Sequence, residues 1–244
     1  ARVPMSVQTA VGSIADLLGL PHDARDTLLR GDALRWAAET EKQVRGAKAF
    51  PLHVVGQLEE TVCDISHPAT LRIICGTVRL MTGASIRQHD LQHTSPRDAH
   101  INATGIFGRS WSTKTTGAGQ GRHWACSAEH VKCDGWLHCC WDLYVQHFGT
   151  NRDYWLPIMD CGTGQVTAEP ENYARFLAAM RWALQRLDVQ DAVEYGCHSA
   201  KPTLISLALG SGADRDTVRA QGGLTDDRML DVYTDETHQT IVCR

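Results

Sequence analysis

The sequence lacks three features, each of which would point to a definite class of protein. It has no excess of positive charge, because 24 basic and 28 acidic side chains give a net charge of −4. This excludes a protein that holds nucleic acid through a positive field over its whole surface. No apolar run approaches the ~20 residues of a membrane-spanning helix, so no membrane insertion is expected. No two cysteines are spaced CxxC, so the regular zinc-knuckle pattern is missing.

The cysteines and the first residues of the chain bear on its compartment. The nine cysteines are an odd number and form no regular framework, which fits reduced thiols rather than a set of disulfides. Ala1-Arg2-Val3-Pro4 begins no apolar signal core. We therefore expect an intracellular protein in a reducing compartment: nucleus, cytoplasm or organelle matrix.

Helical periodicity dominates what is present. With 244 residues and 43% hydrophobic content, the chain can bury a large core. A break at 45–48 divides a helical N-terminal region, 1–48, from a larger domain, 49–244, and the first region resembles the remnant of a further helical domain. Pro51 and Pro68 are each placed to start a helix. The predicted helices beyond the break are 52–62, 69–83, 134–148, 170–187, 199–209, 214–221 and 225–232.

The helical period disappears between residues 99 and 126. Glycines at 105, 108, 117, 119 and 121 interrupt short stretches that hold Phe107, Trp111 and Trp124. This pattern predicts a small antiparallel sheet, with Lys114 at or near a hairpin turn. The predicted fold class is α+β, predominantly helical, with one small sheet.

Five polar residues suit chemistry on a phosphodiester, and they follow one another along the chain in the order Arg87, Lys114, His198, Lys201 and Tyr233. A tyrosine hydroxyl such as that of Tyr233 can attack phosphorus if cations neutralise the developing charge. Arg87 can clamp two oxygens with its planar fork, whereas Lys201 offers a point charge. His198 can hydrogen-bond a phosphate oxygen or assist proton transfer. Lys114, on a hairpin, can give a proton to the leaving oxygen.

The segments around these residues carry a family resemblance. Leu80-Met81-Thr82-Gly83-Ala84-Ser85-Ile86-Arg87-Gln88-His89-Asp90-Leu91 is similar to the first arginine box of the tyrosine recombinases. Ser110-Trp111-Ser112-Thr113-Lys114-Thr115 resembles the hairpin that presents their catalytic lysine. His198-Ser199-Ala200-Lys201 matches their His-x-x-Arg box, and Tyr233 follows Leu224 by nine residues, the family's usual distance to the nucleophile. From about Ala49 to Thr234 the chain resembles the catalytic domain of these phage integrase-like enzymes, which share a core with type IB topoisomerases.

The resemblance implies a function and a set of partners. The chain would break and rejoin duplex DNA by site-specific recombination, leaving a 3′-phosphotyrosine and a free 5′-hydroxyl. It would require no metal or cofactor, and it would assemble as a homo-oligomer on DNA. Tyr233 would be the nucleophile, Arg87, His198 and Lys201 would surround the phosphate, and Lys114 would be the general acid.

Two positions depart from the family pattern. Lys201 stands where the family has a second arginine, and Leu224 replaces a side chain that hydrogen-bonds the phosphate. Losing one preorganised donor costs on the order of 10²-fold in rate. These departures define the alternative hypothesis, in which the fold is retained and the protein is a structural or interaction subunit of a larger complex.

Three further features of the sequence can each be interpreted in more than one way. Lys132 is a second candidate for the hairpin lysine, and Arg109 and Arg122 suit either DNA backbone contacts or a solvated surface. A group of thiols and imidazoles has ligand types that zinc accepts, although its spacing favours buried thiols. That group comprises Cys126, His130, Cys133, His138, Cys139 and Cys140.

Overall fold

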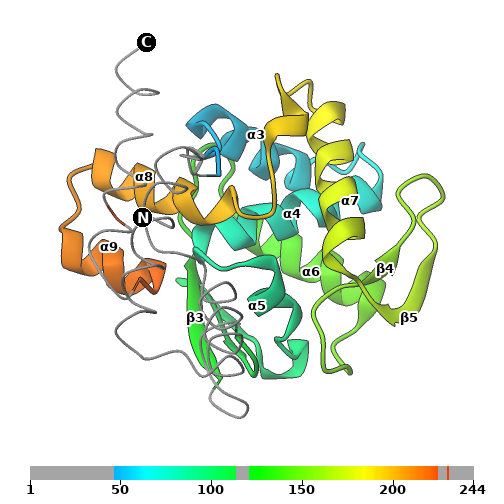
Figure 1. Ribbon diagram of the computed structural model, residues 1–244. Coiled ribbons are helices and arrows are strands. Elements are labelled where there is room, and N and C mark those ends of the chain that lie inside the picture. Colours follow the sequence, from blue (N-terminus) through cyan, green and yellow to red (C-terminus); the bar gives the residue numbers. More distant parts are fainter. Residues whose placement is uncertain (1–46, 114–120, 225–229, 231–244) are drawn as a thin grey trace, which may run out of the picture. The chain divides into compact units, whose positions relative to one another are not determined.

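Helices are the main regular structure in the described part of the chain (Figure 1). The computed structural model describes residues 47–113, 121–224 and Leu230. The predicted class, α+β with mostly helices and a small antiparallel sheet, is confirmed. In chain order the elements are α3 (Leu52–Cys63), α4 (Ala69–Gly83), α5 (Gln88–Gln92), η1 (Pro96–Asp98), β1 (His100–Asn102), β2 (Gly105–Ser110), β3 (Arg122–Ser127), α6 (Trp136–Phe148), β4 (Pro157–Met159), β5 (Val166–Pro170), α7 (Tyr173–Arg186), η2 (Ala192–Glu194), α8 (Ala200–Gly210) and α9 (Arg215–Gly222).

Prolines precede the first two helices, as the sequence predicts. Pro51 has a φ of −60° directly before α3, and Pro68 has a φ of −54° directly before α4. Because the proline ring fixes this angle, the chain is preset to enter a helix at both points. On α3 the predicted apolar stripe is buried except for Leu52, which is 51% exposed.

Helix α4 is the centre of the fold, packing against α3, α6, α7 and α8 (Figure 1). Its stripe from Leu71 to Met81 is buried, and so are several of its polar residues. The Thr77 and Thr82 hydroxyls each donate to a carbonyl oxygen one turn earlier in α4, at 2.9 Å. Since the helix satisfies these hydroxyls internally, it can be buried on several sides at little polar cost.

A buried ion pair joins α3 to α4 and to the loop before α6. Arg79 Nε donates to Glu59 Oε1 at 2.7 Å, and the two side chains are 8% and 0% exposed. Backbone N–H groups of Val131 and Lys132 donate to Glu59 Oε2, each at 2.8 Å. Burial acts to raise the pKa of Glu59, but these N–H donors and Arg79 outweigh it and hold the pKa below its usual value. One carboxylate therefore connects three segments of the core.

The sheet has the order β1-β2-β3 with antiparallel pairing. Its inner face is apolar, and Gly108 lies opposite Trp124. A Cβ on Gly108 would lie 2.4 Å from the indole, so only glycine fits here. The Trp124 Nε1–H donates to Thr94 Oγ1 at 3.1 Å and thereby fixes the ring in the core.

The prediction of a helix from residue 170 is wrong at its N-terminus. Residues Val166–Pro170 form β5, which pairs with β4, and α7 begins at Tyr173. The Asn172 side chain accepts from the Arg175 N–H at 3.0 Å and caps α7. In β5, Val166, Ala168 and Pro170 alternate with Thr167 and Glu169, which is the signal in the sequence for a strand, although all five residues are exposed in the structure.

Helices α8 and α9 confirm two of the predicted short helices. Ile205, Val218 and Leu230 form a small buried cluster of their own, and α8 also packs against α4. The predicted helices in 1–48 and 225–232 fall outside the described residues, apart from residues 47, 48 and 230. In the ranges that are described, none of the helices combines the length and apolar character needed to cross a membrane.

We expect Glu59→Gln to lower the free energy of unfolding by about 3–5 kcal/mol at pH 7, because it leaves Arg79 buried without a counter-charge. The difference in free energy of unfolding should become smaller in acid. Because the pKa of Glu59 is lowered in the folded state, the ionised carboxylate stabilises the protein fully above its ordinary pKa near 4.5. This stabilisation is lost as the pH falls through the pKa of Glu59 in the folded protein. Urea unfolding at pH 7 and below pH 4 measures both effects.

The control for this substitution is Glu60→Gln. Glu60 is exposed and pairs with Lys132 at 3.3 Å, so its loss should cost less than about 1 kcal/mol. Equal effects of the two substitutions would contradict the role given to the buried pair.

Candidate functional site

The turn after α4 sets the position of Arg87. Ser85 is buried with a φ of 48°, in the left-handed region that non-glycine residues rarely adopt. Its Oγ donates to the carbonyl oxygen of Lys201 at 3.3 Å, which links this turn to α8. Arg87 is the N-cap of α5, and its side chain is 28% exposed. The strained turn thus leaves the side chain of Arg87 partly exposed, beside the start of α8.

Lys201 lies in the first turn of α8 and is 4% exposed. Burial, together with the nearby positive charges of Arg87 and Arg122, lowers its pKa to about 8, while Asp90 acts in the opposite direction. The structure therefore brings together Arg87 and Lys201, 114 positions apart in the sequence, with Arg122 as a third cation. Positively charged side chains that repel one another in a buried site are typical of a site that binds an anion.

Asp90 is the carboxylate of this group. It is buried, and its Oδ2 lies 4.0 Å from a terminal nitrogen of Arg87. Within the described residues its Oδ1 is a buried oxygen with no hydrogen-bond partner. A small cavity beside it is lined by Ser85, Asp90, Ser110, Thr113, Arg122 and Trp124, together with Ala84 and Ile86. The spacing of Asp90 three residues after Arg87 is the signal in the sequence from which this carboxylate could have been found.

His198 lies on the surface in the turn before α8. The Ser199 N–H donates to the Gly196 carbonyl oxygen at 2.8 Å, and the Gly196 N–H donates to Ser199 Oγ at 3.0 Å, which closes this turn. The His198 ring centroid is 6.1 Å from that of Tyr173. Its predicted role at the phosphate stays a prediction.

Lys114 and Tyr233 lie outside the described residues, so their predicted roles also stay predictions. Lys132, the second candidate for the hairpin lysine, donates to Glu60 Oε2 at 3.3 Å and lays its aliphatic stem over Gly56 of α3. Leu224 is half-buried and packs on the small cluster between α8 and α9. An apolar contact therefore accounts for leucine at that position.

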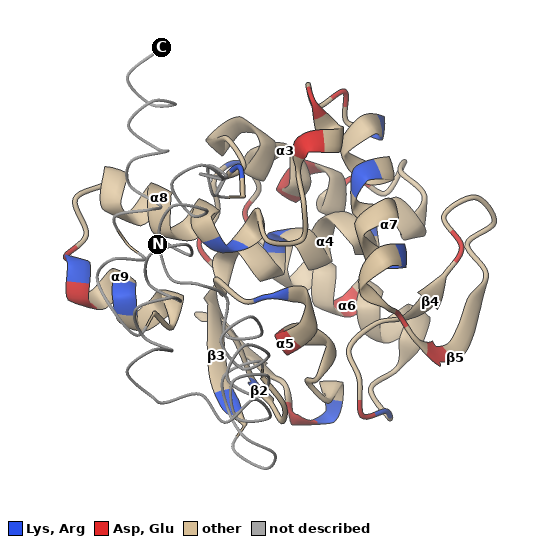
Figure 2. Ribbon diagram, in the orientation of Figure 1, with Lys and Arg blue, Asp and Glu red and all other residues tan. Residues whose placement is uncertain are grey.

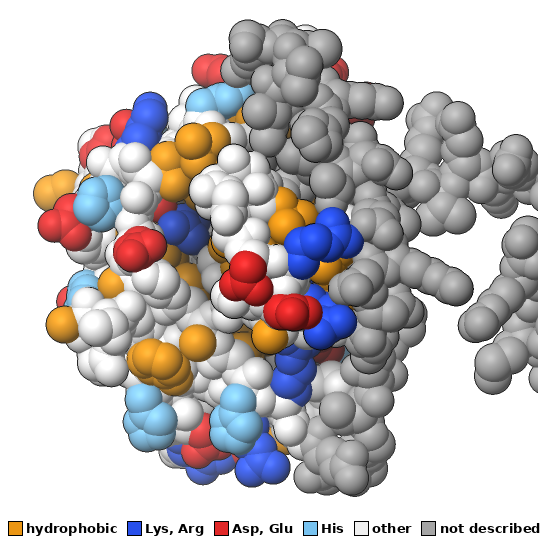
Figure 3. All heavy atoms as spheres, turned by 90° about the vertical axis from the view of Figure 1, so that its left-hand side faces the viewer, with side chains coloured by type: hydrophobic (Ala, Val, Ile, Leu, Met, Phe, Trp, Pro, Cys, Tyr) orange, Lys and Arg blue, Asp and Glu red, His pale blue; other side chains and the backbone are white. Residues whose placement is uncertain are grey.

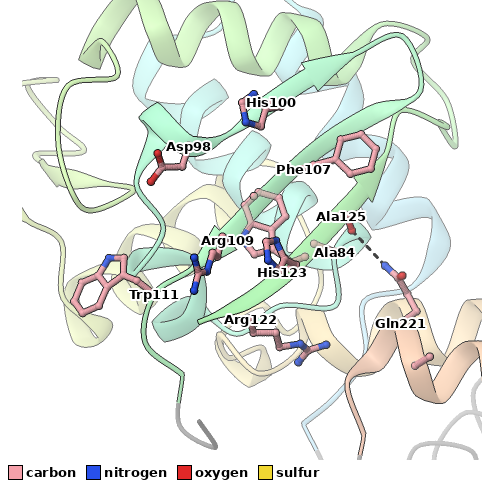
Figure 4. Close-up of a pocket in the computed structure, with 13 residues that line it drawn as sticks. Ala84, Asp98, His100, Phe107, Arg109, Trp111, Arg122, His123, Ala125 and Gln221 are labelled. Carbon is pink, nitrogen blue, oxygen red and sulfur yellow. Dashed lines mark hydrogen bonds between the residues drawn. The ribbon is translucent and has the colours of Figure 1, made fainter. Parts of the chain in front are cut away.

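A larger cleft of about 760 Å³ borders this group on the side of the sheet (Figure 4). The Gln221 Nε2 donates to the Ala125 carbonyl oxygen at 3.3 Å and joins α9 to β3 at one side of the cleft. Arg122 lines both the cleft and the small cavity beside Asp90. The cleft is lined by Ala84, Asp98, His100, Phe107, Gly108, Arg109, Trp111, Arg122, His123, Trp124, Ala125, Ala220 and Gln221.

Charges of both signs lie on the side of the domain that holds α9. Figure 2 marks basic and acidic residues next to one another along α9, and Figure 3 shows side chains of both signs on this side. On α9 itself, Arg219 pairs with Asp216 at 2.9 Å. The basic residues of α9 are therefore accompanied by acidic ones.

The thiol and imidazole group is not a metal site in the part of the chain that the structure describes. Among those residues, no three histidine, cysteine, aspartate or glutamate side chains are grouped so that they could hold a metal ion. Cys126 is buried, and burial raises the pKa of Cys126 and of Cys140 to about 12. These side chains are thiols that pack in or against the core, as the spacing favours.

Known structures share this arrangement of elements. No family model matches the chain, and no curated protein matches it significantly. The post-cleavage complex of the XerH site-specific recombinase with a palindromic difH substrate is similar over 80% of this chain and 51% of its own, with 10% identity and a TM-score of 0.57. The XerA recombinase is similar over 99% of this chain and 82% of its own, with 12% identity and a TM-score of 0.55. The XerH pre-cleavage complex with difH gives 11% identity and a TM-score of 0.55, and the chain spans about half the length of the two XerH proteins.

We expect Lys201→Met to raise the free energy of unfolding at pH 7. Below pH 8 the wild-type ammonium is charged and buried at a cost, and a pKa lowered from 10.5 to about 8 corresponds to about 3 kcal/mol. Between pH 8 and 10.5 the unfolded chain binds more protons than the folded one, so wild-type stability rises with pH. The difference between the two proteins should therefore close towards pH 10.5 in urea unfolding.

Lys48→Met is the control for this pH series. Lys48 is 42% exposed and pairs with Glu194 at 2.7 Å, which raises its pKa. Its removal should not stabilise the protein at any pH. A Lys201→Met protein that is less stable than wild type at pH 7 would argue against a destabilised ammonium.

Proposed function

We propose that this chain, which has the fold of the tyrosine recombinases, breaks and rejoins strands of duplex DNA through a covalent link between Tyr233 and a 3′-phosphate. The observation that carries the proposal is that the buried Lys201 lies close enough to Arg87 and Arg122 to feel their charge, while Arg122 and Asp90, the partner of Arg87, line a small cavity. A phosphodiester supplies the anion that such a group lacks. The likeness to XerH, which is bound to its difH substrate, supports DNA as the partner.

The side chains divide the reaction between them. The Tyr233 oxygen attacks phosphorus and gives its proton to solvent water, the bond from phosphorus to the 5′ oxygen breaks, and the 5′ oxygen takes a proton from Lys114. The Arg87 fork donates to two nonbridging oxygens, and Lys201 adds a point charge. His198 hydrogen-bonds a phosphate oxygen. The reverse attack by a 5′-hydroxyl restores the strand without another source of energy.

The site's own electrostatics favour the bound state. Without an anion, Arg87 and Arg122 lower the pKa of Lys201, whereas a bound phosphate raises it and keeps the ammonium charged at pH 8. Asp90 Oδ2 lies 4.0 Å from a terminal nitrogen of Arg87 and helps to position its guanidinium. Recombination by this scheme needs strands from more than one site, so active assemblies are oligomers on DNA.

The test of the proposal is a duplex with a nick next to the scissile bond, which traps the covalent intermediate because the released fragment diffuses away. Wild-type protein should form an adduct that resists denaturing electrophoresis, and Tyr233→Phe should form none. Arg87→Lys should reduce adduct formation about 10²-fold or more, because a point charge replaces the fork.

Arg186→Lys is the matched control, since Arg186 is exposed at the end of α7 and stacks over Trp182 at 5.7 Å. It should leave the yield of adduct unchanged. If wild type and Tyr233→Phe give the same result on a range of duplex sequences, the proposed chemistry is wrong.

A second candidate function is a structural or interaction subunit that keeps the fold and lacks the reaction. The net charge of −4 and the apolar packing of Leu224 favour it. Salt separates the two candidates: a protein that neutralises several phosphates should lose affinity for duplex DNA steeply between 50 and 200 mM salt, as roughly 0.9 counterions are released per contact. Undetectable or salt-independent binding in a titration of labelled duplex would favour the subunit role.

A further inference from the structure

The outer face of the sheet carries exposed aromatic and basic side chains in alternation. Phe107 and Arg109 point to the same side of β2 because side chains of a strand alternate. Trp111 follows directly after the end of β2 and lines the same cleft, and Phe107 and Trp111 are 42% and 50% exposed. In register, His123 lies opposite Arg109, and His100 lies opposite Phe107. Figure 4 shows these side chains along the sheet. We call these five residues the outer sheet face.

Large exposed rings on a sheet are unusual when nothing covers them. Phe107 and Trp111 lie four residues apart, which is roughly 13 Å along a strand, and Arg109 lies between them. Stacking on a ring needs a flat partner, and the arginine needs an acceptor. A strand of bases and phosphates offers both at short intervals.

The Trp111 ring is held in place before any ligand arrives. Its Nε1–H donates to the Asp153 carbonyl oxygen at 3.1 Å, and its ring meets His93 edge-on at 4.6 Å. Half of the residue nevertheless stays exposed. A ring fixed in this way loses little conformational entropy when a base stacks on it.

The outer sheet face leads to the candidate catalytic group. The face lines the cleft of about 760 Å³, and Arg122 lines both this cleft and the cavity beside Asp90. Arg109 and Arg122 provide positive charge along the path, while Asp98 contributes a carboxylate at the side of the cleft near His100. The balance of charge along the path favours an anionic chain.

We infer that the outer sheet face binds unpaired nucleotides of a DNA strand, with bases stacked on Phe107 and Trp111 and phosphates contacted by Arg109 and Arg122. The inference rests on the proposed function, since that identifies DNA as the ligand. Duplex DNA presents its base edges and phosphates but hides the faces of its bases, so the exposed rings favour a strand that has left the helix. A strand opened next to the scissile phosphate would run from the catalytic group across the sheet.

The test measures binding of fluorescein-labelled (dT)16 and of a labelled hairpin duplex by anisotropy. Wild-type protein should bind (dT)16, and Phe107→Leu/Trp111→Leu, which keeps apolar bulk but removes the rings, should weaken that binding roughly 10-fold or more. Binding of the duplex should change less than about 2-fold. Leu52→Ala, which alters a side chain on α3 that is also 51% exposed, should change neither.

Charge and folding are checked separately. Arg109→Gln should lower the slope of log affinity against log salt for (dT)16 by about 0.7, the value for one phosphate contact to a single strand. The single variant Phe107→Leu leaves the contacts of Trp111 intact. If its urea midpoint equals that of wild type, a loss of (dT)16 binding by this variant reports on the outer sheet face and not on unfolding.

Three results would overturn the inference: wild type that does not bind (dT)16, a double variant that binds (dT)16 as well as wild type does, or a double variant that loses both ligands equally. A change of sedimentation coefficient without a change in (dT)16 binding would instead identify the face as a contact between protein chains, which also overturns it. The covalent adduct on nicked duplex reports the proposed function independently. An adduct without (dT)16 binding rejects only the sheet face, and (dT)16 binding without an adduct rejects only the strand transfer.

Discussion

The fold depends on one carboxylate buried between helices. Glu59 receives Arg79 from α4 and backbone N–H groups from the loop before α6, so it fixes how α3, α4 and α6 meet. Arg79 also lies 4.3 Å from the centre of the Trp136 ring. Because both charges are removed from water, each is tolerated only while the other is in place. The position of α4 follows from this pair, and the turn that presents Arg87 follows from the position of α4.

The candidate site has the opposite electrostatic character. Around Glu59 the charges are satisfied by the protein itself, whereas Lys201 is buried near two arginines and one carboxylate. Within the described residues Asp90 Oδ1 accepts no hydrogen bond, and its ion-pair contact is His89 Nδ1 at 3.5 Å. A protein tolerates such a group because the remainder of the core is well satisfied. Under the proposed function a phosphate neutralises the cations of this group, and the sheet beside it carries exposed rings and a further arginine.

Most of the predicted elements are confirmed because their signals are local. Apolar spacing and prolines predicted α3 and α4, and glycine-separated stretches predicted the sheet. The recombinase-like fold, expected from the order of short boxes, is confirmed by structures that share only 10–12% identity with the chain. The β4–β5 hairpin was missed because its strands have only three and five residues, and the short alternation in β5 does not stand out from the helical pattern that follows it. The division at residue 48, together with the roles of Lys114 and Tyr233, remains a prediction.

The sequence by itself determined which residues could do chemistry on a phosphodiester. The guanidinium of Arg87, the ammonium of Lys201 and the phenol of Tyr233 have donor and acceptor properties that are fixed by residue type. It also determined the helix that carries Lys201 and the helix that ends at Gly83, four residues before Arg87, because helical periodicity can be recognised from neighbouring residues. Only the tertiary structure decided that Lys201 is buried, that Arg122 and Asp90 join it, and that Phe107 and Trp111 share an exposed face with Arg109. The reason is physical: burial and Coulomb interactions depend on distances between residues far apart in the chain, and these distances exist only once α4, α8 and the sheet have packed together.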